Sequence, residues 1–156
     1  MKKGSTLFLR AVVIITGLIA LGFYLALLPY AMTMEMKGDF DYLPLMIGFY
    51  LPAIPFFFAL YQALKLLGLI DKNKAFSKGS VKALKGIKFS AFIISAIFAA
   101  GVPYVFYLAD RDDAPGAALF IFVIVGASFV IGVTAALFQQ LFQSAVKIKS
   151  ENDLTV

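Results

Sequence analysis

Four long apolar stretches separated by short polar segments set the pattern of this chain. They cover residues 7–30, 43–70, 87–108 and 117–146. A helix crosses a bilayer core of about 30 Å with about 20 apolar residues, so each stretch is long enough to span a membrane. The first stretch is longer than the apolar core of a signal peptide, and we expect it to be retained. The pattern predicts an all-α integral membrane bundle of four transmembrane helices, in a single domain over residues 1–156.

Charged residues are divided between the two sides of the predicted membrane. Every lysine and arginine except Lys37 and Arg111 falls on the side of the two termini and the 71–86 loop. Basic residues next to spans stay in the cytoplasm, so both termini are predicted to be inside. Most acids are predicted to be outside, namely Glu35, Asp39, Asp41, Asp110, Asp112 and Asp113, whereas Asp71, Glu151 and Asp153 fall inside. The basic side indicates contact with anionic lipid headgroups rather than with nucleic acid.

Composition narrows the chemistry further. Hydrophobic residues make up 62% of the 156 residues and charged residues 15%, and the mean hydropathy is +0.91. The chain has no His, Cys or Trp, which excludes Cys/His zinc sites, thiol redox chemistry and His-dependent nucleophilic catalysis. We therefore predict no cofactor, no metal site and no enzymatic activity.

Two pairs of similar segments hint at an internal repeat. Residues 59–64 and 136–141 share the pattern Ala-Leu-aromatic-Gln-x-Leu, and Pro29-Tyr30 and Pro103-Tyr104 occupy similar places in the first and third stretches. These matches favour two tandem αα-hairpins of the same orientation. The alternative is that aromatic and polar residues recur because membrane interfaces favour them.

Small residues at four-residue steps predict helix-packing surfaces, because close backbone approach holds helices together in lipid. The predicted packing positions are Gly22, Ala26, Ala91, Ser95, Ala99, Ser128, Gly132, Ala136, Gln140 and Ser144.

The second and fourth stretches also carry polar or helix-breaking residues that predict a cavity or a bend, since each proline removes a backbone donor. The predicted cavity-lining residues are Pro52, Pro55, Gln62, Gln139 and Gln140.

The inner loop and the C-terminal tail form a predicted docking surface for a partner. Lys78, Lys82 and Lys85 share one helical face at the start of the third span, which is typical of a segment that lies on anionic headgroups or binds a protein. The predicted partner-binding residues are Phe76, Lys78, Lys82, Lys85, Glu151, Asn152, Asp153 and Leu154. The acids of the outer loops fit no calcium-loop spacing, and we interpret them as solvated turns.

The inner loop and the tail also carry a resemblance to a known family. Phe76-Ser77, the run from Val81 to Lys88, Asp113-Ala114-Pro115-Gly116 and the Glu151-Asn152-Asp153-Leu154-Thr155 ending resemble the YoaS-like family of small four-span bacterial membrane proteins, the domain of unknown function 2975. The resemblance implies a bacterial cytoplasmic membrane location. It also implies association with a helix-turn-helix regulator of the Cro/C1 type, often encoded next door.

Together these observations predict a non-enzymatic membrane protein that regulates or tethers a cytoplasmic partner such as a transcription regulator. The alternative is a small-molecule transporter or a channel subunit, with the prolines and glutamines named above lining its path. A homo-oligomer is compatible with either hypothesis.

Overall fold

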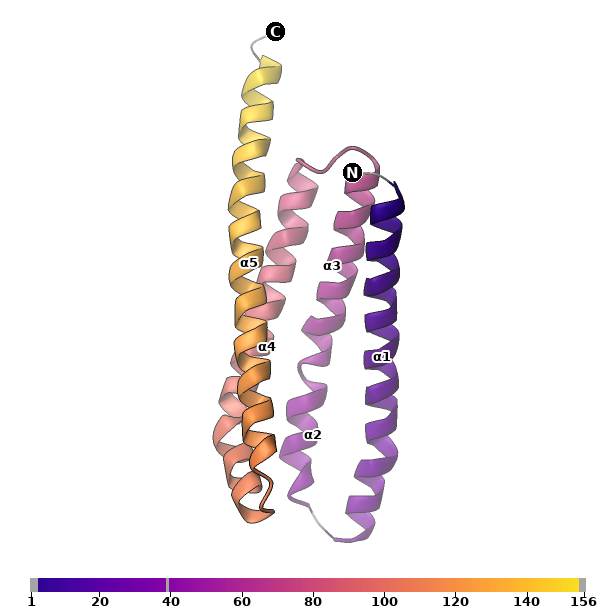
Figure 1. Cartoon of the computed structure of the whole chain (residues 1–156), viewed down its shortest axis with the longest axis vertical. Helices are drawn as coiled ribbons and strands as arrows, with labels where there is room; N and C mark the ends of the chain where they lie inside the picture. Colours follow the sequence, from indigo (N-terminus) through magenta and orange to yellow (C-terminus); the bar gives the residue numbers. More distant parts are fainter. Residues whose placement is uncertain (1–2, 39, 155–156) are drawn as a thin grey trace.

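The computed structural model describes residues 3–38 and 40–154, and these residues form helices with no strand. The elements in chain order are α1 (Lys3–Met36), α2 (Tyr42–Tyr50), α3 (Ala53–Asp71), α4 (Lys78–Arg111) and α5 (Pro115–Leu154) (Figure 1). The segments long and apolar enough to cross a membrane are Gly4–Met34, Leu43–Asp71, Lys78–Arg111 and Pro115–Leu154. The predicted fold class is confirmed, with α2 and α3 together forming the second span.

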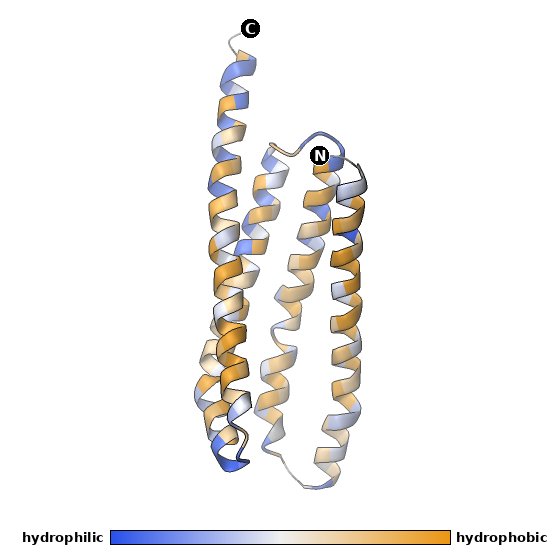
Figure 2. Cartoon of the chain, in the orientation of Figure 1, coloured by the Kyte–Doolittle hydropathy of each residue, from blue (hydrophilic) through white to orange (hydrophobic). Residues whose placement is uncertain are grey.

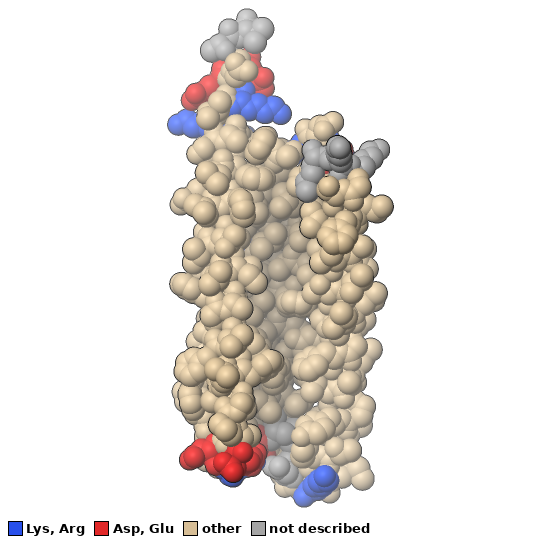
Figure 3. Space-filling view, viewed as in Figure 1, with Lys and Arg blue, Asp and Glu red and all other residues tan. Residues whose placement is uncertain are grey.

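Charged side chains mark two ends of the molecule, and the surface between them is apolar (Figures 2 and 3). We call the end formed by the start of α1, the 72–77 loop and the start of α4 the basic end, and the opposite one the acidic end. Lys2 and Asp39, which belong to the predicted charge pattern, lie outside the described residues. Large apolar side chains such as Leu7, Ile19 and Ile54 are exposed. Lipid chains match such a surface, whereas water does not.

The helices form an open row instead of a closed ring. Within the described residues, α4 packs against α5 and α3, whereas α1 packs only against α2 and α3. The chain therefore consists of two hairpins of the same orientation, α1 with α2–α3 and α4 with α5 (Figure 1). This topology agrees with the predicted tandem hairpins.

The break between α2 and α3 follows from two prolines. Pro52 and Pro55 have no amide hydrogen, so the carbonyls one turn before each of them lose their helical donor. Backbone angles at Leu51 and Pro52 stay in the right-handed helical region. The chain therefore bends at this point but keeps its direction, and α3 resumes the span.

Small residues hold the α4–α5 hairpin together. The hydroxyl of Ser95 donates to the carbonyl of Val125 at 3.1 Å, and Gly132 lies against the ring of Phe92, so close that a Cβ there would be 2.7 Å from a ring carbon. The buried residues of α5 are Ile121, Ser128, Gly132, Ala135 and Gln139. Small side chains thus allow the close approach that membrane helices need.

Several predicted packing positions are wrong. Ala99 is exposed on α4, and Gln140 and Ser144 are exposed on α5. Steps of four residues advance about 40° beyond a full turn, so a stripe of four such steps leaves the interface, whereas steps of three and four stay on it. Gly22 and Ala26 of α1 are exposed too, and nothing lies within 4 Å of a Cβ built on Gly22.

Polar contacts connect α1 to the rest of the chain at the basic end. The Arg10 guanidinium is 2.8 Å from the Asp71 carboxylate at the end of α3. The hydroxyl of Thr6, one helical turn before Arg10, donates to the same carboxylate. Deeper in the span, the Tyr50 hydroxyl donates to the Tyr24 carbonyl at 2.6 Å. These contacts hold α1 in the first hairpin, because α1 packs against no helix other than α2 and α3 within the described residues.

Hydrogen bonds between residues close in sequence set the conformation of the loop between α3 and α4. Asn73 has a positive φ of 59°, and the amides of Asn73 and Lys74 bond to the carbonyls of Ile70 and Leu69. This arrangement is a Schellman motif, which ends α3. Ser77 then caps α4, because its hydroxyl accepts from the Ser80 amide at 3.3 Å.

Replacing Ser77 with alanine should lower the free energy of unfolding by about 1 kcal/mol, because the first turn of α4 loses an acceptor for an orphan amide. Unfolding by sodium dodecyl sulfate, followed by circular dichroism, measures the change. The control is Ser144→Ala, at an exposed position where the serine makes no side-chain hydrogen bond within the described residues. Equal midpoints for the two variants would contradict the capping role of Ser77.

Candidate functional site

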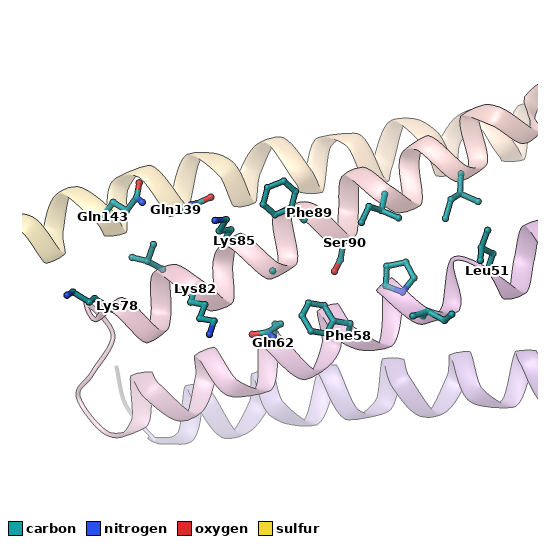
Figure 4. A pocket seen from close by; sticks show the side chains of 16 residues that line it. Leu51, Phe58, Gln62, Lys78, Lys82, Lys85, Phe89, Ser90, Gln139 and Gln143 are labelled. Carbon is teal, nitrogen blue, oxygen red and sulfur yellow. The ribbon is translucent and has the colours of Figure 1, made fainter.

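A groove of about 1050 Å³ runs along α4 from the basic end toward the middle of the span. α3 lies on one side of it and α5 on the other (Figure 4). Its lining residues change in character along the groove, from cationic at the mouth, through amides and a hydroxyl, to apolar. We call it the α4 groove.

The cationic mouth consists of Lys78, Lys82 and Lys85, which are exposed and which line the α4 groove. The helical repeat places them on one face of α4, four and three residues apart. None of the three forms an ion pair within the described residues. Figure 4 shows Lys82 beside Gln62 of α3, and Lys85 on the side of α5.

Amide and hydroxyl groups lie just below this mouth. The Gln62 side-chain oxygen is buried and has no hydrogen-bond partner among the described residues. Gln139 is only 9% exposed and also lines the groove, and its amide makes no hydrogen bond within the described residues. Ser90 is 3% exposed at the same groove wall. A buried oxygen without a partner, such as that of Gln62, loses the hydrogen bonds it would have with water, so this part of the groove is suited to bind a polar ligand.

Along the groove, α3 and α4 approach closely at one point. A Cβ at Gly86 would be 3.1 Å from Gln62 and 3.2 Å from the ring of Phe58. Beyond this contact the lining is apolar, with Leu51, Ile54, Pro55, Phe58, Phe89, Ile93 and Ile97. Ile97 also lines a second apolar hollow of about 680 Å³ between α2, α4 and α5.

The predicted cavity residues are only partly brought together. Pro55, Gln62 and Gln139 line the α4 groove. Pro52, which is buried at the start of α3, does not line it. Gln140 is exposed and does not line the groove, because the next residue on a helix points about 100° away from Gln139.

The predicted docking residues separate into two groups. The three lysines belong to the α4 groove, whereas Phe76 stacks edge-on against Phe142 of α5, with ring centroids 5.2 Å apart. Phe76 and Lys149 line a shallow hollow at the basic end. The tail residues Glu151, Asn152, Asp153 and Leu154 form the exposed last turn of α5, which extends past the other helices (Figure 1). The tail therefore does not fold back onto the lysines.

At the acidic end, one arginine connects the two hairpins. Arg111 of α4 pairs with Asp41 before α2 and with Asp112, and the Tyr104 hydroxyl donates to the Asp41 carbonyl. Asp113 has a positive φ of 52° and helps to end α4. No group of three or more acids is placed to hold a metal ion within the described residues.

Sequence reasoning missed the apolar and hydroxyl part of the groove. Phe58, Phe89 and Ser90 were not among the predicted site residues, although Phe89 continues the face of Lys78, Lys82 and Lys85 at a four-residue step. That step was the available signal, because residues four apart lie on the same side of a helix.

Comparisons with known proteins find a matching family and a full-length relative. The family, described as "Protein of unknown function (DUF2975)", matches residues 8–156. The chain is 47% identical, over 160 residues and 100% of both chains, to the "Uncharacterized membrane protein YoaS" of Bacillus subtilis (strain 168). No solved structure matches the chain.

Proposed function

Because this chain belongs to the DUF2975 family, we propose that it is a non-enzymatic membrane protein that holds a cytoplasmic regulator at the membrane. The observation that carries the proposal is the end of α5, which continues as a helix past the basic ends of the other helices (Figure 1). A helix that leaves the membrane and stays exposed offers a surface that a soluble protein can bind. Apolar side chains are part of this surface, since Ile148 is 66% and Leu154 83% exposed.

The charge distribution supports an orientation with this surface in the cytoplasm. Lysines concentrate at the basic end, and the flanks of spans that are rich in lysine and arginine stay inside. An even number of spans then brings both chain ends to the cytoplasmic side of a bacterial plasma membrane. Phe76 and Lys149 extend the docking surface from the projecting helix onto the 72–77 loop.

The nature of the partner comes from the family resemblance. A helix-turn-helix regulator of the Cro/C1 type, encoded next to the gene, is the partner that the resemblance implies. Held at the membrane, such a regulator is kept from its operator, and release restores DNA binding. The membrane protein itself makes no contact with nucleic acid in this proposal.

A chain that ends at residue 149 should lose most of the regulator in a pulldown, by at least about tenfold, because the docking turn is removed while the spans stay intact. Mild-detergent extraction from the native host with quantitative mass spectrometry measures the regulator per membrane protein. The double variant Glu151→Gln, Asp153→Asn keeps the helix and removes only charge. Retention of the regulator by the truncated chain would overturn the proposed docking site.

A transporter or channel receives less support. The α4 groove opens to the side, the helices form an open row, and Gln140 lies outside the groove. Residues 3–38 and 40–154 of a single chain enclose no path, so transport would need a homo-oligomer. Uptake or conductance in reconstituted vesicles would favour this alternative over tethering.

A further inference from the structure

We propose that the α4 groove binds one anionic glycerophospholipid from the leaflet at the basic end. The phosphate and the headgroup lie among the three lysines of the mouth and the amides next to them, and the acyl chains lie along the apolar part. This site is independent of the tethering proposal, because it needs only that the chain resides in a membrane.

The mouth has the charge for a phosphate. Lys78, Lys82 and Lys85 line the groove, and no carboxylate lines it with them. The nearest acid along the 71–77 loop, Asp71, is already paired with Arg10. The Lys85 ammonium lies 5.9 Å from the centroid of the Phe89 ring, which places a cation over the start of the apolar part. Three cations with no counter-ion among the described residues form an attractive site for an anionic headgroup.

The amides of Gln62 and Gln139 add a requirement for hydrogen bonds to the requirement for negative charge. The buried oxygen of Gln62 accepts hydrogen bonds but has no donor within the described residues, and the amide of Gln139, a residue that is 9% exposed, makes no hydrogen bond there either. Phosphatidylglycerol offers what both lack, because its headgroup hydroxyls donate and its ester and phosphate oxygens accept. A free phosphate would satisfy the lysines and leave the apolar lining without a ligand.

The length of the groove suits an acyl chain. Lys82 and Ile97 are both lining residues, and 15 residues of helix rise about 22 Å. One leaflet contributes about half of a hydrocarbon core of about 30 Å. A headgroup at the lysines thus places its chains along Phe89, Ile93 and Ile97, at the depth of that leaflet.

Charge also decides between a lipid and a second copy of the chain. Two copies that cover each other's grooves around a two-fold axis would bring both sets of lysines together, and like charges at close range repel. A neutral lipid would fill the apolar part but leave the lysines without counter-ions. An anionic lipid satisfies both halves of the groove.

The test uses the full chain, delipidated in a mild detergent and titrated with phosphatidylglycerol or with phosphatidylcholine of the same acyl chains. Native mass spectrometry counts the bound lipids. We expect one phosphatidylglycerol to bind at least about tenfold more tightly than phosphatidylcholine. Equal binding of the two lipids, or a lipid-free dimer as the main species, would overturn the proposal without any variant.

Two pairs of matched variants locate the site. The triple variant Lys78→Gln, Lys82→Gln, Lys85→Gln should lose the preference, whereas Lys72→Gln, Lys74→Gln, Lys147→Gln removes the same charge from outside the groove and should keep it. Ile93→Trp fills the apolar part and should weaken binding several-fold, whereas Leu18→Trp on exposed α1 should not. Equal effects within either pair would mean diffuse attraction to the surface and would refute the groove site.

Discussion

Replacing Gly132 with leucine should separate α5 from α4 and lower the free energy of unfolding by roughly 2–3 kcal/mol, the upper part of the cost of overpacking a core. A Cβ at Gly132 would be 2.7–3.0 Å from three carbons of the Phe92 ring. That ring already contacts Phe129, with centroids 5.7 Å apart, so it has little freedom to move aside. A leucine adds three further carbons to the same space.

Gly126 provides a matched control on the same helix. Nothing lies within 4 Å of a Cβ built on it, so Gly126→Leu makes the same chemical change on an exposed face. Unfolding in sodium dodecyl sulfate, followed by circular dichroism, compares the two variants. A loss of stability as large in Gly126→Leu as in Gly132→Leu would show that the cost lies in the helix backbone and not in the contact with Phe92.

The sequence was sufficient for the fold class because a bilayer permits few solutions. A chain segment in lipid must satisfy its own backbone hydrogen bonds, so long apolar stretches become helices. The four predicted stretches are all found as spans. The helices run further than the stretches, since α1 extends to Met36 and α5 to Leu154. Hydropathy marks the depth of the membrane, whereas a helix ends where a cap or turn stops it.

The packing face of α5 was only half predictable. Ser128 and Gly132 were predicted and are buried, but further along the helix Ala135 and Gln139 are buried in place of Gln140. The period of a helix is 3.6 residues, so two helices that pack at a small angle keep contact through alternating steps of three and four. A run of small residues does not reveal whether the next buried position lies three or four residues further along the helix.

The candidate site could be predicted in parts but not as a whole. The basic face of Lys78, Lys82 and Lys85 and the pair Gln62 and Gln139 were recognised separately, the first as a docking surface and the second as a cavity. Their union in one groove depends on which helices are neighbours. A single sequence shows which residues share one face of a helix, but it does not show which helices are neighbours. The structure was therefore needed to place the lysines and the glutamines in one groove.

The ion pair between α1 and α3 was missed for the same reason. Arg10 and Asp71 were counted on the same side of the membrane, yet 61 positions of chain separate them, and only the packing of α1 against α3 brings them within 2.8 Å. An arginine inside an apolar helix and a lone acid at the end of the second span were the available signals. We expect the loss of this ion pair to have a large effect on the first hairpin, because α1 has few other contacts.

Replacing Asp71 with asparagine should destabilise the first hairpin by about 2 kcal/mol, less than the 3–5 kcal/mol of a fully buried pair. The expected loss of stability is smaller because water screens the two charges, since the Arg10 and Asp71 side chains are 38% and 22% exposed. The cost arises because Arg10 keeps its charge, and its Nε is buried with no hydrogen-bond partner in the part of the chain that the structure describes. The double variant Arg10→Gln, Asp71→Asn should recover part of the loss, as removal of both charges leaves none unpaired.

Cross-linking reports this change locally, because the natural chain has no cysteine. Gly17 and Leu60 face each other between α1 and α3, with a Cβ on Gly17 3.4 Å from the Leu60 side chain. Cysteines at these two positions should be joined readily by a short thiol-reactive cross-linker in the parent chain and more slowly after Asp71→Asn. Asp153→Asn removes an acid that has no ion pair within the described residues, and should leave the rate unchanged. If Asp71→Asn also left the rate unchanged, the Arg10–Asp71 pair would contribute nothing to the hairpin.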